Sequence, residues 1–413
     1  MSDARRVLVV SLQYPPYIGG GYELLTRDAV EGLRRRGVEA TVLTARGEAF
    51  EGEPHVLPLL APSLDGEGDL FRRSFGASNA ERFRLHFLRL ANYRATLGAI
   101  DRVRPDVVLY FNLAHLSLAP VLAARHAGVP TLGYAADAWA RNHWVQAWRE
   151  AQEGPGAKGG RLAALEGAWR IFRGHVGLGR LLACSARLKG ELTADGLAPE
   201  SVGVLWPAVT PALAALAPSE PPARRAPGEP LRVLCSSSFW EGKGQHVLLK
   251  AASRARARGA AVEVTLAGAG EGEYADYLRE LAREPELDGA VRFAGRVARE
   301  ELAELLRGSH ALATPSLWSE PFGMVTSEAL TFGLPVLGSD AGATPEILAG
   351  GGGLVLTAGD PEPWCDALFR LAGDEDRRHT LALEAYARAP EFSEERFLDA
   401  FGAELERASG TAP

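Results

Sequence analysis

The most informative chemical pattern in the sequence is a pair of glutamates, Glu320 and Glu328, separated by seven residues. Glu320 falls in a loop after a strand predicted over 311–315, and Glu328 falls near the start of a helix predicted over 325–332. The free backbone N–H groups at the start of a helix can bind a phosphate. A carboxylate is not needed to bind that phosphate. The two glutamates can therefore accept hydrogen bonds from hydroxyl groups of the ligand. Phosphate and hydroxyl groups together favour a sugar nucleotide as the ligand. For an isolated glutamate, a solvated position near a helix start is the usual alternative.

A lysine near the start of another predicted helix could meet the phosphates of such a ligand. Lys243 belongs to segment 240–244, whose sequence is WEGKG. An ammonium facing a diphosphate offsets the negative charge that builds up on the leaving group. A charge-assisted hydrogen bond of this kind contributes roughly 1.5–3 kcal/mol. The segment is not a Walker A loop, because no Ser or Thr follows Lys243. An exposed loop lysine is the alternative.

Alternating strands and helices must position these groups. A strand over 7–11, a Pro/Gly-rich loop, a helix from about residue 23 and a strand over 38–44 form a βαβ unit, which builds a parallel sheet. Segment 217–230 has five prolines in 14 residues, and this change in composition marks it as the boundary between two α/β units. Beyond it we predict strands over 232–236, 262–267, 291–294, 311–315 and 336–338, and helices over 246–258, 273–283, 300–308, 325–332 and 394–409.

Two successive α/β units in 413 residues predict two Rossmann-like domains. Ligands of such sheets bind beyond the carboxyl ends of the strands, which predicts a cleft between the domains as the site. We place the domains at 1–206 and 207–392, with the terminal helix, about 393–413, packing back on the first.

Composition limits the partners and the location. Acidic residues exceed basic ones by 52 − 45 = 7, which argues against a nucleic-acid partner. The three cysteines, Cys184, Cys235 and Cys365, lie far apart and form no CxxC pair, and no histidines have metal-ligand spacing. A reducing, cytoplasmic location fits this pattern. No apolar stretch approaches the roughly 18–20 residues of a spanning helix, although peripheral membrane contact stays open.

Several motifs in order resemble one family of enzymes over nearly the whole chain. Residues 15–23 resemble a P-P-x-x-G-G-x-E loop and helix, and residues 236–244 resemble a phosphate-binding segment that ends in Lys-Gly. Residues 314–328 resemble an E-x7-E signature, and residues 329–346 resemble the stretch that follows it. Together they resemble the retaining glycosyltransferases of family 4. That resemblance implies the GT-B architecture, with two Rossmann-like domains and an interdomain cleft.

The resemblance also implies roles for individual residues. Glu320 would hold hydroxyls of the donor sugar near the reacting carbon, and Glu328 would accept hydrogen bonds from the ribose. The residues implied to contact the donor are Gly20, Gly21, Ser238, Lys243, Arg296, Val297, Phe322, Gly323, Met324 and Glu328. Ser238 stands where the family commonly has an arginine, and Arg296 is a possible substitute.

The acceptor side departs further from the family pattern. Ala136 stands where many relatives carry a histidine, but Asp137 is kept. Asp137 either serves as a catalytic residue beside Glu320, by orienting the acceptor hydroxyl or taking its proton, or caps the next helix. Trp139, His143 and Trp144 follow, and they either line the acceptor site or belong to the core.

These inferences predict a hexosyltransferase that moves a sugar from a nucleotide-diphosphate sugar to a hydroxyl acceptor. The same-face mechanism implied by the resemblance requires no metal and no cofactor beyond the co-substrate. The nucleobase and the sugar of the donor, the oligomeric state and the acceptor, whether a small molecule, a glycan or a lipid-linked molecule, stay open. A catalytically silent sugar-nucleotide binder or partner subunit, and a nucleotide-sugar 2-epimerase, are the alternatives.

Overall fold

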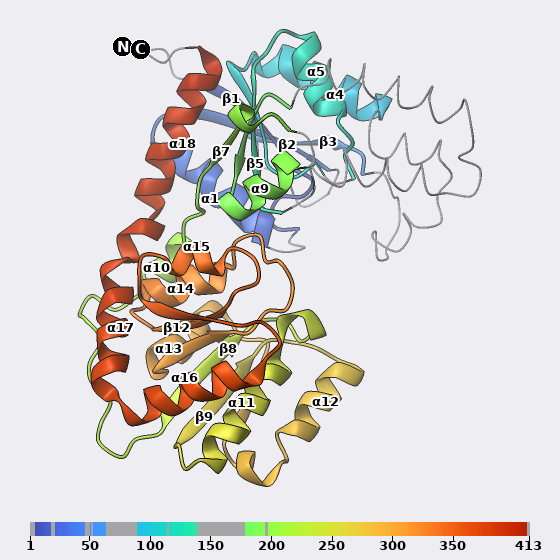
Figure 1. Cartoon of the computed structure of the whole chain (residues 1–413). Helices are drawn as coiled ribbons and strands as arrows, with labels where there is room; N and C mark the ends of the chain where they lie inside the picture. Colours follow the sequence, from blue (N-terminus) through green and yellow to red (C-terminus); the bar gives the residue numbers. More distant parts are fainter. Residues whose placement is uncertain are drawn as a thin grey trace. The chain divides into compact units, whose positions relative to one another are not determined.

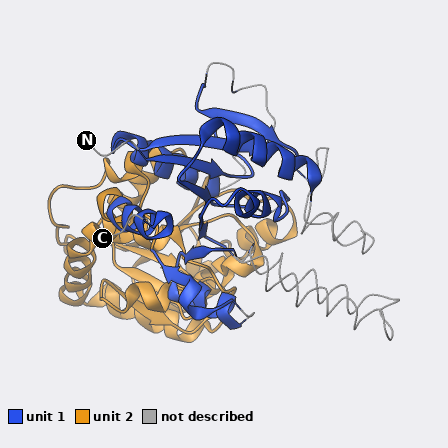
Figure 2. Ribbon diagram, turned by 90° about the horizontal axis from the view of Figure 1, so that it is seen from above, with its two compact units in different colours: residues 1–205, 398–413 blue, residues 206–397 orange. Residues whose placement is uncertain are grey.

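The computed structural model of the chain forms two compact units, shown in different colours in Figure 2. Unit 1 comprises residues 1–205 and 398–413, and unit 2 comprises residues 206–397. The predicted domain limits were 206/207 and 392/393. The structure describes residues 5–17, 21–45, 50, 53–62, 89–113, 115–137, 139, 178–194 and 197–410.

The described part of unit 1 contains a seven-stranded parallel sheet in the order β3-β2-β1-β4-β5-β6-β7 (Figure 1). Its strands are β1 (Arg6–Val10), β2 (Glu39–Ala45), β3 (Val56–Leu60), β4 (Val107–Tyr110), β5 (Thr131–Ala135), β6 (Arg180–Ala183) and β7 (Val202–Val204). Its described helices are α1 (Gly21–Arg35), α4 (Leu90–Val103), α5 (Ala119–His126), α9 (Ala186–Ala194) and the 3-10 turn η3 (Pro199–Ser201). The apolar run of β1 is fully buried, as expected for a central strand covered on both faces.

The C-terminal helix α18 (Glu394–Ser409) begins in unit 2 and packs along unit 1. Phe401 is fully buried, and its ring centroid lies 6.1 Å from that of Phe111. Glu404 accepts a hydrogen bond of 2.9 Å from the Arg180 guanidinium. Leu398 lies so close to Gly32 on α1 that the end of its side chain would have to shift to make room for a Cβ there.

Unit 2 contains a six-stranded parallel sheet in the order β10-β9-β8-β11-β12-β13. Its strands are β8 (Leu231–Ser236), β9 (Val262–Ala267), β10 (Val291–Gly295), β11 (Ala311–Thr314), β12 (Val336–Ser339) and β13 (Gly353–Leu356). Its helices are α10 (Pro211–Ala214), α11 (Gln245–Ala257), α12 (Glu273–Leu281), α13 (Arg299–Gly308), α14 (Met324–Thr331), α15 (Thr344–Leu348), α16 (Pro361–Gly373) and α17 (Glu375–Ala387). Three 3-10 turns accompany them: η4 (Glu241–Lys243), η5 (Pro285–Leu287) and η6 (Ala389–Phe392). Helices α11 and α16 lie side by side over the sheet (Figure 1), and the fully buried Trp364 belongs to the core there.

The order of strands shows at which edge of the unit 2 sheet a ligand is expected to bind. From β8 the chain runs outward through β9 and β10, and then returns to place β11 on the other side of β8. Loops that leave the two strands at such a switch point diverge, which opens a crevice beyond their carboxyl ends. The segments after β8 and β11 carry Lys243 and Glu320 respectively.

The proline-rich segment 217–230 belongs to unit 2 and is bound to α17. Glu375 accepts hydrogen bonds from the Arg225 amide, at 2.9 Å, and from the buried Arg378 guanidinium. Burial favours the neutral acid, but these hydrogen bonds prevail and lower the pKa of Glu375 to about 2. None of the described helices has the length and apolar character needed to span a membrane.

Candidate functional site

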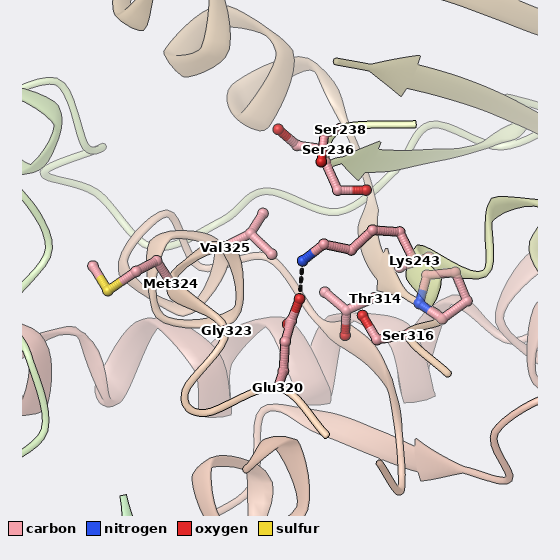
Figure 3. A pocket seen from close by; sticks show the side chains of 12 residues that line it. Ser236, Ser238, Lys243, Thr314, Ser316, Glu320, Gly323, Met324 and Val325 are labelled. Carbon is pink, nitrogen blue, oxygen red and sulfur yellow. Dashed lines mark hydrogen bonds and ion pairs between the residues drawn. The ribbon is translucent and has the colours of Figure 1, made fainter. Parts of the chain in front are cut away.

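A pocket of about 210 Å³ lies at the carboxyl ends of β8 and β11 (Figure 3). All of its lining residues belong to unit 2. They are Ser236, Ser237, Ser238, Lys243, Ala313, Thr314, Pro315, Ser316, Glu320, Gly323, Met324 and Val325. The pocket therefore brings together five of the predicted site residues: Ser238, Lys243, Glu320, Gly323 and Met324.

Lys243 and Glu320 point toward each other in this pocket and form an ion pair (Figure 3). The Lys243 side chain is 20% exposed and that of Glu320 is 7% exposed. The indole N–H of Trp318 donates a hydrogen bond of 3.3 Å to the same carboxylate oxygen, Oε1 of Glu320. The Lys243 ammonium also lies 5.5 Å from the centre of the Trp318 ring, within cation–π range. Two donors thus hold one oxygen of a nearly buried carboxylate.

Two glycines allow the backbone to approach closely on either side of the Glu320 loop. Gly244 has a φ of +69°, and a Cβ there would lie 1.9 Å from the Pro315 carbonyl oxygen. Gly342 has a φ of +74°, and a Cβ there would lie 2.3 Å from the Glu320 amide nitrogen. The next residue, Ala343, donates its amide to the Glu320 carbonyl at 2.9 Å. Only glycine fits either position without moving the loop.

The start of α14 forms one wall of the pocket. Gly323 precedes the helix with a φ of +85°, and Gly323, Met324 and Val325 line the cavity. A Cβ on Gly323 would lie 3.0 Å from Oε2 of Glu320, so the glycine leaves space for that carboxylate. The first N–H groups of an α-helix have no intrahelical acceptor, and the helix dipole favours an anion beside them.

Hydroxyl groups form much of the remaining wall. Those that line the pocket belong to Ser236, Ser237, Ser238, Thr314 and Ser316. Oγ1 of Thr314 is buried and has no hydrogen-bond partner among the described residues. The buried Gln245 donates from Nε2 to Oγ of Ser237 and to the carbonyl of Ser238, both at 2.9 Å. This arrangement of one cation, many hydroxyls and a helix start suits a phosphorylated ligand.

Glu328 lies on α14 but does not line the pocket. In the part of the chain that the structure describes, its carboxylate has no hydrogen-bond partner. Glu328 is half-buried, and the loss of hydration around its carboxylate raises its pKa to about 7, while the positive charge of Arg299 acts in the opposite direction. Because no described residue bonds to it, the Glu328 carboxylate can still accept hydrogen bonds from a ligand.

Four other described residues that were predicted to contact the donor, Gly21, Arg296, Val297 and Phe322, do not line the pocket. Arg296 is exposed, Val297 is half-buried, and both follow β10. The Phe322 side chain is 4% exposed, and its ring centroid lies 6.1 Å from that of Trp206. Gly21 is the first residue of α1 in unit 1, and Gly20 lies outside the described residues.

Asp137 follows β5 in unit 1, and it bonds the backbone next to it. Its Oδ1 accepts the Trp139 amide at 2.8 Å, while the amides of Ala136 and Asp137 donate to the Tyr22 hydroxyl. Burial raises the pKa of Asp137, and the hydrogen bonds from Trp139 and Tyr22 lower it in part. Of the two roles left open for Asp137, the structure contains the contact that a capping role requires. Its catalytic role stays a prediction.

The predicted aromatic acceptor residues divide into described and undescribed positions. Trp139 is 3% exposed and packs edge-on against Tyr110, with ring centroids 5.9 Å apart. Its ring is therefore part of the packing of unit 1, and an acceptor could reach it only after a rearrangement. His143 and Trp144 lie outside the described residues.

Within the described ranges, Glu362, Cys365 and Asp366 alone have ligand atoms close enough together to hold a metal ion. They belong to α16 and do not line the pocket. The two carboxylates pair with Arg254 at 2.8 Å and with Arg258 at 2.6 Å. Their charge is therefore already balanced by arginines.

Five of the residues now seen at the site fall within the predicted segments 236–244 and 314–328 but were given no individual role. They are Ser236, Ser237, Thr314, Ser316 and Trp318. The serines and the threonine end or follow β8 and β11, so the rule for switch points could have found them. The bond from Trp318 to Glu320 depends on side-chain orientation, for which the sequence contains no signal.

Two parallel α/β units, the second with an anion-suited pocket at its switch point, define the GT-B class of two-Rossmann proteins. The family model described as Glycosyltransferase Family 4 matches residues 19–213, and that described as Glycosyl transferases group 1 matches residues 218–388. The chain belongs to this group 1/family 4-like group of glycosyltransferases. The predicted pair of parallel α/β domains, the glycosyltransferase family and the prediction that the chain is a glycosyltransferase are thereby confirmed.

Individual relatives agree with this assignment. The chain is similar to D-inositol 3-phosphate glycosyltransferase of Nocardia farcinica, at 36% identity over 174 residues, which cover 41% of this chain and 38% of that protein. It is also 28% identical to glycogen synthase of Mycobacterium tuberculosis over 372 residues. These residues cover 84% of this chain and 80% of that protein. Among solved structures, Anabaena HepE in complex with UDP and glucose has a TM-score of 0.66 at 20% identity, covering 98% of this chain and 100% of that one. This last likeness shows the fold.

Proposed function

We propose that the enzyme transfers a hexosyl-type sugar from a nucleotide-diphosphate sugar to a hydroxyl acceptor, with retention of configuration and without a metal ion. The observation that carries the proposal is the Lys243–Glu320 pair in a hydroxyl-lined pocket beside the start of α14. A cation and helix amides suit a diphosphate, and a carboxylate suits sugar hydroxyls.

Each group of the donor has a partner in this proposal. The diphosphate binds Lys243, the serine hydroxyls after β8 and the first amides of α14. Glu320 accepts hydrogen bonds from hydroxyls of the sugar, and Glu328 accepts them from the ribose. The absence of a hydrogen-bond partner for Glu328 among the described residues supports its part of the assignment. The family resemblance assigns the acceptor to the N-terminal unit.

The proposed reaction exchanges one bond at the anomeric carbon. The bond from this carbon to the diphosphate oxygen breaks, and a bond from the acceptor oxygen forms on the same face of the sugar. The acceptor proton passes to an oxygen of the departing diphosphate, so no histidine base is needed at Ala136. Lys243 stabilises the negative charge that develops on the diphosphate. Retention rests on the family resemblance, and the anomeric configuration of the product by NMR tests it.

Metal independence has a direct test. We expect transfer to persist in EDTA, because Lys243 and the α14 amides supply the positive charge that a metal ion supplies elsewhere. Activity that EDTA abolishes and Mg²⁺ or Mn²⁺ restores would contradict this part of the proposal.

A thermal-shift screen identifies the donor. Binding raises the apparent stability by mass action, so the correct nucleotide stands out among UDP, GDP, ADP, TDP and their common sugars. UDP-glucose is the first donor to test, because the HepE structure contains UDP and glucose. If purified protein binds a sugar nucleotide but neither transfers nor hydrolyses it, the chain is a silent binder and the proposal fails.

A further inference from the structure

The Lys243 ammonium has a protein partner in the same pocket where we place the diphosphate. It pairs with Oε1 of Glu320, and both side chains are largely buried. In the described ranges, Lys243 is the sole lysine or arginine that lines this pocket. The positive charge proposed for the diphosphate is therefore already balanced by a carboxylate before any ligand binds.

The Glu320 carboxylate needs partners of its own. It is 7% exposed, and its Oε1 receives the Lys243 ammonium and the Trp318 indole N–H. A buried charge that loses its partner costs considerable free energy. If a diphosphate draws Lys243 away, only a new donor to Glu320 can offset that cost.

The intact donor and the free product differ in whether they supply that new donor. A sugar nucleotide brings sugar hydroxyls, which replace Lys243 on Glu320. A nucleoside diphosphate has lost the sugar and brings none, so it must share the ammonium with Glu320. The repulsion between its phosphates and the Glu320 carboxylate, which the proposal places in the same pocket, is also not offset by any sugar hydroxyl.

We propose that Glu320 has a second role as an internal competitor of free diphosphate for Lys243. The pocket thereby favours the intact sugar donor over the diphosphate product, and Glu320 recovers Lys243 when the product departs. This inference rests on the proposed function, because it takes the pocket to be the donor site.

Inorganic pyrophosphate, which has the charge of the product but no sugar and no base, tests the competition. We would measure its affinity by calorimetry at pH 8 for the wild type, Glu320→Gln, Lys243→Met and the double variant. Glu320→Gln should bind pyrophosphate about tenfold more tightly, because the ammonium loses its internal partner and the pocket loses a negative charge. The gain should vanish in the double variant, in which no ammonium remains to be released.

Glu328→Gln is the matched control. It also removes one carboxylate, which is ionised at pH 8, but Glu328 does not pair with Lys243. It should leave pyrophosphate affinity within about twofold of the wild type. Circular dichroism confirms that each variant is folded before it is compared.

The possible outcomes separate the inference from the proposed function. The proposed competition is wrong if Glu320→Gln binds pyrophosphate as tightly as the wild type or more weakly. It is also wrong if neither the wild type nor Glu320→Gln binds pyrophosphate measurably. A gain that persists in the double variant contradicts it as well, because that gain would not depend on Lys243. Lys243→Met that binds both pyrophosphate and the sugar donor normally would instead overturn the placement of the diphosphate, and with it the proposed function.

Discussion

Asp137 in unit 1 and Glu320 in unit 2 are both acidic residues that follow a strand at the carboxyl edge of a parallel sheet, but they have different partners. Asp137 accepts the amide of Trp139, two residues along the chain, and a hydrogen bond from the Tyr22 hydroxyl. Glu320 bonds side chains, Lys243 and Trp318, and Lys243 comes from the loop after a different strand. A backbone amide within the same turn stays in place when a ligand binds, whereas a lysine side chain can exchange one anion for another. The carboxylate with an exchangeable partner is the better candidate for chemistry.

The largest expected effect follows from removing that carboxylate. Glu320→Ala should lower turnover by about 10²-fold or more, a loss of about 3 kcal/mol in positioning the transition state. Steady-state assays of sugar transfer, with folding checked by circular dichroism, measure it. Near-normal activity would remove Glu320 from the proposed site.

A backbone change beside Glu320 should have the next largest effect, this time on stability. Gly342→Ala adds a Cβ 2.3 Å from the Glu320 amide at a φ of +74°, so it combines strain with a clash and should cost about 2–4 kcal/mol. Gly259→Ala is the matched control, because its φ of +93° imposes similar strain with no atom within 4 Å. Urea unfolding compares the two. Equal losses would show that the close approach to Glu320 contributes nothing to stability.

Glu328 provides a pH-dependent contrast with the paired Glu320. Its pKa is raised from 4.5 to about 7 in the folded protein, so the folded state binds the proton more tightly than the unfolded state. The contribution of this proton to the stability of the folded protein is complete below about pH 4.5. It is lost as the pH rises through about 7. Glu328→Gln should therefore be more stable than the wild type at pH 8, by about 1–2 kcal/mol, and similar to it at pH 4.5.

Donor affinity should change in the opposite sense with pH. The ionised Glu328 accepts hydrogen bonds from ribose more strongly, so wild-type affinity for the sugar nucleotide should rise between pH 6 and pH 8. Glu328→Gln should bind the donor more weakly and lose this dependence. Titrations at the two pH values measure both effects, and unchanged affinity in the variant would argue against the ribose role.

Local patterns in the sequence were sufficient for much of the fold. The predicted strand over 262–267 and the predicted helix over 394–409 have the bounds of β9 and α18, because apolar periodicity and nearby glycines mark them. Strand β13, with only four residues after a run of glycines, was not predicted, since so short a segment has little periodicity.

The site itself was predictable by residue type but not by contact. The E-x7-E spacing indicated Glu320, and the Lys-Gly segment indicated Lys243. Their pairing joins residues 77 positions apart and depends on the tertiary fold, so no local pattern contains it. The spacing also could not show that Glu320 lines the pocket while Glu328, on the same motif, does not.

The smallest expected effects concern Asp137, and they complete the contrast with Glu320. Asp137→Ala removes the acceptor for the Trp139 amide and should cost about 1 kcal/mol of stability, whereas Asp137→Asn keeps an acceptor oxygen and should cost little. If capping is the whole role of Asp137, the Asn variant should also transfer sugar at nearly the wild-type rate. A stable Asn variant that loses turnover by tenfold or more would show that the charge itself is used, and the two carboxylates would then share the chemistry. Urea unfolding and transfer assays on both variants distinguish these outcomes, because capping follows the acceptor oxygen and catalysis follows the charge.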